Sequence, residues 1–107
     1  MEAKEILKNI LPNKNPCERT LYMIYNYRDL KKGAEINEED REIAKMIEKA
    51  VEMIGDDKYI DIVKMMMQGE KPEEIAYKIP IERNSVYKQR RRLIKRLSVI
   101  IFGDKAL

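Results

Sequence analysis

The sequence contains no histidine and no tryptophan, and Cys17 is its only cysteine. A single cysteine excludes an intramolecular disulfide, and with no histidine the chain has too few His and Cys ligands for a zinc site. Ser-His-Asp and Cys-His catalytic groups are excluded for the same reason. We therefore expect no metal and no cofactor, and we expect that the protein is not an enzyme.

Long apolar runs are also missing. No stretch approaches the roughly 20 apolar residues that span a bilayer. The N-terminal residues 1–5, Met-Glu-Ala-Lys-Glu, lack the apolar core of a secretory signal. We therefore expect a cytoplasmic protein without a membrane partner.

Glycine and proline are scarce, with four of each in 107 residues, whereas helix-forming Glu, Lys, Ile, Leu and Met are abundant. This balance predicts an all-α fold. A chain of this length supports one compact domain, for which we expect five or six helices. The expected segments are a short N-terminal helix with a linker (residues 1–16), a helical support bundle (17–69) and a C-terminal unit (70–107).

Apolar spacing and capping signals place the expected helices along the chain. Asn37 is a favourable N-cap for the third helix, and Asp56 or Asp57 for the fourth, which Gly69 ends. Pro72 suits the first turn of a short fifth helix. The remaining expected helices cover residues 2–10, 17–32, 38–52 (the third) and 83–101 (the last).

Charge is distributed unevenly along the chain. Residues 33–57 carry nine acidic and three basic side chains, whereas residues 83–107 carry eight basic and one acidic. The formal net charge of +3 conceals this asymmetry. A concentrated basic end predicts a polyanionic partner.

The stretch from Pro72 to Leu97 has the spacing of a helix-turn-helix unit. Ala76 is a small residue in the short helix, where a second helix must approach closely. Five residues later, Ile81 is expected as a buried plug in the turn, and five more lead to Val86, the first inward residue of the long helix. The stripe that holds this helix on the body is expected to be Val86, Leu93, Leu97 and Ile100.

The polar side of the long helix is the expected DNA-reading surface. In the major groove, Arg pairs with guanine edges and Asn with adenine edges, at about 1–3 kcal/mol of discrimination each. The expected base-reading residues are Arg83, Asn84, Ser85, Tyr87, Lys88 and Arg91. The expected phosphate contacts are Lys78, Arg92, Lys95 and Arg96.

The same stretch resembles a known signature, that of helix-turn-helix units of the sigma-factor region 4 type. The layout of residues 17–102 also resembles the ArpU/RinA-type phage transcriptional regulators. The resemblance implies a sequence-specific, DNA-binding transcriptional regulator of phage or prophage origin, with double-stranded DNA and RNA polymerase as partners. The matching residues are Glu74-Ile75-Ala76, Ile79, Ile81, Ser85-Val86, Leu93 and Leu97.

Two residues depart from the family pattern. Pro80 stands where the pattern has Gly, and Glu82 stands where it has a capping Ser. Proline fixes φ near −65°, so the usual left-handed turn residue cannot occur there, and the turn is expected to differ locally.

Two alternative functions stay open, together with the oligomeric state. A phage small terminase subunit recognises packaging DNA through a similar unit and forms a ring of many copies. A sigma-like protein-interaction module binds polymerase without touching DNA, so charge reversal at Arg83, Lys88 and Arg91 would leave its function intact. A regulator with one reading helix generally needs a homodimer or an additional contact, for which residues 99–102 are a candidate surface.

Overall fold

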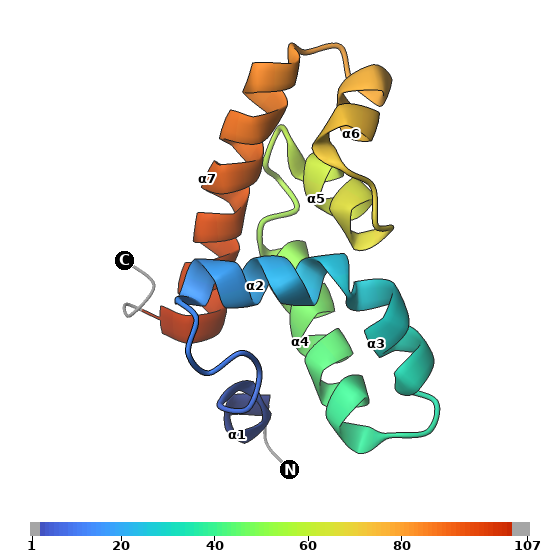
Figure 1. Ribbon diagram of the computed structural model, residues 1–107, viewed down its shortest axis with the longest axis vertical. Coiled ribbons are helices and arrows are strands. Elements are labelled where there is room, and N and C mark those ends of the chain that lie inside the picture. The colour runs from blue at the N-terminus through green and yellow to red at the C-terminus, as the bar shows by residue number, and fades with distance from the viewer. Residues whose placement is uncertain (1–2, 104–107) are drawn as a thin grey trace.

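The computed structural model describes residues 3–103, and every regular element in that range is helical (Figure 1). The all-α prediction is confirmed, with seven helices instead of five or six. The helices are α1 (Ala3–Leu7), α2 (Pro16–Tyr25), α3 (Tyr27–Gly33), α4 (Glu38–Met53), α5 (Ile60–Met67), α6 (Pro72–Lys78) and α7 (Arg83–Phe102).

One additional helix arises because the expected helix over residues 17–32 is broken at Asn26 into α2 and α3. Asn26 leaves the helical region with φ −98° and ψ 8°. Its side-chain nitrogen donates to the carbonyl oxygen of Tyr22 at 2.7 Å. Asn side chains compete with the backbone in this way and so favour helix ends. The predicted continuous helix was therefore wrong at this position.

The first helix is shorter than the expected residues 2–10. Glu2 lies outside the described residues, and α1 ends at Leu7. The Arg19 side chain of α2 forms two hydrogen bonds near this end of α1. Its Nε donates to the carbonyl oxygen of Ile10 at 2.8 Å, and its Nη2 donates to the carbonyl oxygen of Leu7. The Arg19 side chain thus supplies hydrogen-bond donors to carbonyl groups at and just after the end of α1.

The long helix α7 packs against four other helices, α2, α4, α5 and α6. Val86, Leu93 and Leu97 are fully buried, which confirms the predicted stripe, whereas Ile100 is only half-buried. Each such burial contributes about 1.5–3 kcal/mol. Ile94, 5% exposed, belongs to a second buried row that was not predicted. The buried side therefore fixes which side of α7 faces outward.

The connection between α6 and α7 is a tight turn centred on Pro80. Ile79 is extended, as residues before proline tend to be. The backbone nitrogen of Ile81 donates to the carbonyl oxygen of Ile79 at 2.8 Å, a three-residue turn that the fixed φ of proline suits. The turn thus forms without a left-handed residue. Ile81 itself is half-buried and is not the buried plug that was expected.

No helix between residues 3 and 103 has both the length and the apolar content needed to cross a bilayer.

Glu82 is the N-cap residue of α7, which begins at Arg83, and its side chain makes no capping hydrogen bond to a described residue. Replacing Glu82 with Ser offers an acceptor to the first-turn N–H groups and is expected to raise the free energy of unfolding by about 0.5–1 kcal/mol, measured by urea unfolding. Glu82→Ala is the matched control, because it removes the same charge without providing an acceptor. Equal stability of the Ser and Ala variants would contradict the capping explanation.

Candidate nucleic-acid interface

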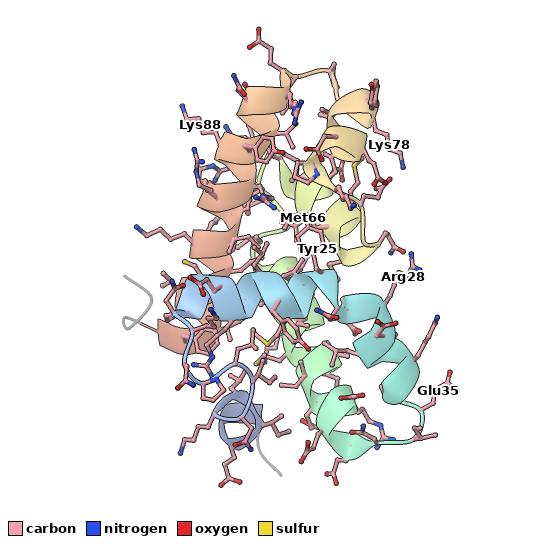
Figure 2. The ribbon with its side chains drawn as sticks, in the orientation of Figure 1. Tyr25, Arg28, Glu35, Met66, Lys78 and Lys88 are labelled. Carbon is pink, nitrogen blue, oxygen red and sulfur yellow. The ribbon has the colours of Figure 1, made fainter. Side chains whose placement is uncertain are left out.

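Four polar side chains lie on the side of α7 opposite its buried stripe. Asn84, Lys88, Arg91 and Lys95 follow at steps of four, three and four residues, which places them on one helix face. All four are exposed, and no other described residue forms an ion pair with the three cations. Figure 2 shows Lys88 projecting from α7 away from the rest of the chain. We call these four residues the outward ridge.

On one flank of the ridge, Glu73 of α6 binds two of the predicted base-reading residues. Its Oε1 lies 3.0 Å from Nη2 of Arg83 and accepts a hydrogen bond from the Tyr87 hydroxyl at 2.7 Å. The hydrogen bond from Tyr87, with a smaller contribution from Arg83, lowers the pKa of Glu73. The structure therefore directs Arg83 and Tyr87 toward α6, where they fix the start of α7.

On the other flank, Asp57 in the α4–α5 loop binds two of the predicted phosphate-contacting residues. Arg92 donates to both of its carboxylate oxygens at 2.8 Å, and Arg96 donates to Oδ2 at 2.9 Å. The Asp57 side chain is only 6% exposed. We call these three residues the Asp57 clamp, and it attaches α7 to the loop that precedes α5.

The Asp57 carboxylate is strongly stabilised in its charged form. Hydrogen bonds from Arg92 are the largest cause, and they hold its pKa well below the usual range although burial opposes them. The backbone nitrogen of Tyr59 adds a further bond at 3.0 Å. Asp57 was expected as a helix cap, but the N-cap of α5 is Tyr59. Its main partners are instead 35 and 39 residues away in sequence.

Two more predicted contacts lie elsewhere. Lys78 forms an ion pair with Glu70, and in Figure 2 its side chain projects to the side of the α6–α7 pair opposite Lys88. Ser85 is half-buried. Of the ten predicted site residues, the structure thus brings Asn84, Lys88, Arg91 and Lys95 together on one exposed face.

Tyr77 is a further exposed residue near this surface that was not predicted from the sequence pattern. Its side chain is 93% exposed on α6, an unusual state for a large aromatic residue. Together with Ala76 and Arg83 it lines a hollow of about 290 Å³ between α6 and the start of α7. The sequence did contain one indication of this exposure. Residues two positions apart along a helix lie on nearly opposite sides, and Tyr77 follows the buried Ile75 by two residues in α6. Tyr77 is therefore an exposed aromatic side chain of α6 that lies near the start of α7.

Comparison of the chain with protein-family models, curated proteins and solved structures found no significant match.

The chemistry available on this surface is that of contacts with an anion. The ridge offers one amide and three cations, and the described residues contain no group of three or more His, Cys, Asp or Glu arranged to hold a metal ion. Amide, guanidinium and ammonium groups are the side chains that contact base edges and phosphates in protein–DNA complexes. Glu73 and Asp57 fix the helix that carries them.

Proposed function

We propose that this protein is a sequence-specific DNA-binding protein that places the outward ridge in the major groove. The observation that carries the proposal is the division of α7 into two sides, with Val86, Leu93 and Leu97 fully buried on one and four polar residues exposed on the other. A helix of 20 residues is about 30 Å long. The major groove is about 12 Å wide and admits an α-helix.

The ridge residues have distinct roles in this proposal. The Asn84 amide matches the paired donor and acceptor of adenine, and the Arg91 guanidinium matches the two acceptors of guanine. Lys88 and Lys95 supply cations for neighbouring acceptors or phosphates, which add affinity and register. Arg83 and Tyr87, bound to Glu73, orient the start of the helix, and Tyr77 offers a further donor to the DNA backbone.

Transcriptional regulation is the role that the resemblance to phage regulators implies, with RNA polymerase as a second partner. The proposed action is binding without a chemical step. We propose that the protein binds its DNA in the cytoplasm.

The proposal is tested by selecting duplexes from a random pool and measuring affinity for the enriched sequence over a salt series. Because the ridge carries three cations, we expect the logarithm of the association constant to fall clearly with the logarithm of the salt concentration. Lys95→Gln is expected to reduce the magnitude of this slope by about 0.9, because one phosphate contact is lost. Lys45→Gln on α4, also exposed, is the control and should leave the slope unchanged. Failure to enrich any sequence, or a slope near zero, would contradict the proposal.

A further inference from the structure

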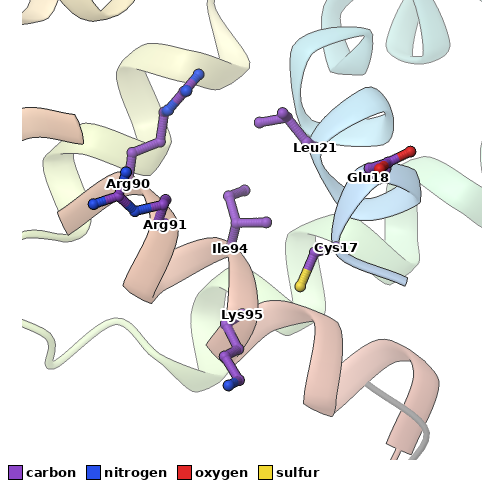
Figure 3. A pocket seen from close by; sticks show the side chains of 7 residues that line it. All are labelled: Cys17, Glu18, Leu21, Arg90, Arg91, Ile94 and Lys95. Atoms are coloured by element: carbon purple, nitrogen blue, oxygen red, sulfur yellow. The ribbon is translucent and has the colours of Figure 1, made fainter. Parts of the chain in front are cut away.

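A groove lies between α2 and α7, next to the outward ridge. Its volume is about 320 Å³, at the lower end of the about 300–1,000 Å³ typical of binding sites. Leu21 of α2 and Ile94 of α7 point into the space between the helices, with Cys17 beside them (Figure 3). The cationic residues that line it are Arg90, Arg91 and Lys95. We call this feature the cationic groove.

The two walls of the cationic groove are already held in place. The hydroxyl groups of Thr20 and Ser98 lie 2.8 Å apart where α2 crosses α7, and both residues are fully buried. Glu18 is the one acidic residue among those that line the groove, and its carboxylate accepts a hydrogen bond from the Asn15 side chain at 3.0 Å. An occupant would therefore meet a preformed apolar floor with an excess of positive charge, and binding would cost little ordering entropy.

A protruding surface with acidic side chains lies at the corner between α3 and α4. Ile36 is 89% exposed and directly precedes Asn37, the N-cap of α4. An apolar residue at this position often packs against the fourth helical residue. Here that residue is Arg41, whose Nε donates to the carbonyl oxygen of Ala34 at 3.0 Å. The usual partner for Ile36 is therefore replaced by a charged side chain.

The corner presents Ile36 on an ordered backbone. The nitrogens of Ile36 and Asn37 both donate to the carbonyl oxygen of Gly33, at 3.0 and 2.9 Å. Glu35 directly precedes Ile36 in the sequence and Glu39 follows three residues later, and both are exposed. Figure 2 shows Glu35 at the end of this corner, far from Lys88 on α7. We call Ile36 with Glu35 and Glu39 the acidic knob.

We propose that the acidic knob of one copy of this chain inserts into the cationic groove of a second copy. Ile36 would cover the apolar floor formed by Leu21 and Ile94, and the two carboxylates would face the cations that line the groove. Apolar and charge complementarity thus coincide in a single contact. Because the two surfaces differ, the contact is head-to-tail, and it produces a ring if it closes or an open chain if it does not.

Self-association and DNA binding use some of the same residues. Arg91 and Lys95 belong to both the cationic groove and the outward ridge. A copy whose groove is occupied therefore has fewer cations for phosphates, so duplex DNA and a second copy compete. This competition rests on the proposed function, whereas the contact between copies does not.

The contact is tested by sedimentation equilibrium of the full chain without DNA, from about 10 μM to about 1 mM, a range that covers weak contacts between small surfaces. Wild-type protein is expected to associate, and Ile36→Lys and Leu21→Lys are each expected to weaken association at least about tenfold. Met53→Lys is the control, because Met53 is 60% exposed on α4 and lies outside both surfaces. It should associate like the wild type.

An equimolar mixture of the two variants gives the decisive result. The Leu21→Lys copy keeps its knob and the Ile36→Lys copy keeps its groove, so the mixture is expected to form a one-to-one dimer and nothing larger. If Leu21→Lys fails to fold, the exposed substitution Lys95→Glu serves as the groove variant. Wild-type protein that stays monomeric, association that survives Ile36→Lys, or a mixture that stays monomeric would overturn the proposal. None of these results depends on whether the chain binds DNA.

Discussion

Replacing both Lys88 and Arg91 with Glu is expected to weaken binding to the selected duplex at least about 100-fold. The lost contact of Arg91 with a base edge costs about 1–3 kcal/mol, the loss of Lys88 removes a cation from neighbouring acceptors or phosphates, and the new carboxylates add repulsion from the phosphates. Both side chains are exposed and form no ion pair with another described residue, so the fold should tolerate the change. Fluorescence anisotropy of the labelled duplex measures the loss.

The matched control is the replacement of Lys45 and Lys49 with Glu on α4. Both lysines are exposed and the change in net charge is identical, so it separates a general electrostatic effect from a local one. We expect at most a small loss, which added salt screens. Equal losses in the two double variants would show that α7 is not the contact surface.

Replacing Asp57 with Ala is expected to lower the free energy of unfolding by about 2 kcal/mol at neutral pH. Removing one partner of a fully buried ion pair costs about 3–5 kcal/mol. Arg92 and Arg96 are 45% and 43% exposed and regain hydration, which reduces the cost. Urea unfolding measures the difference, and Asp56→Ala is the control because Asp56 is the exposed neighbour. Equal stability of the two variants would contradict the role of the Asp57 clamp.

The effect of Asp57→Ala should also depend on pH. The pKa of Asp57 in the folded state lies below the unfolded value of about 3.9, so the stabilisation is complete above about pH 4 and is lost as the pH falls further. The difference in stability between wild type and Asp57→Ala should therefore shrink progressively below about pH 4. A difference that grew in acid would contradict the lowered pKa.

The features that the sequence predicted well are those set by local periodicity. Val86, Leu93 and Leu97 recur at helical spacing, and the structure buries all three. Asn37 was expected to cap the third helix, and its Oδ1 accepts from the backbone nitrogen of Asp40 at 2.9 Å. Gly69 was expected to end the fourth helix, and it adopts a φ of +84°, which glycine tolerates best. In each case, the residues that predict the feature lie within a few positions of that feature in the sequence.

The features that the sequence did not reveal depend on partners distant along the chain. Nothing near Arg92 or Arg96 indicates that both reach Asp57, and so they were expected to bind phosphate. Arg83 was likewise expected to read bases, whereas Glu73 from the preceding helix binds it. A basic residue on an exposed face also has a structural partner where a carboxylate of the fold reaches it. That condition is set by tertiary packing.

The most direct test of the central claim is an NMR titration of isotope-labelled protein with the selected duplex. If the outward ridge enters the major groove, we expect the largest changes in backbone amide shifts at Asn84, Lys88, Arg91 and Lys95. Changes concentrated on α4, or on the end of α7 around Ile100 and Ile101, would contradict this expectation, because those residues face away from the outward ridge.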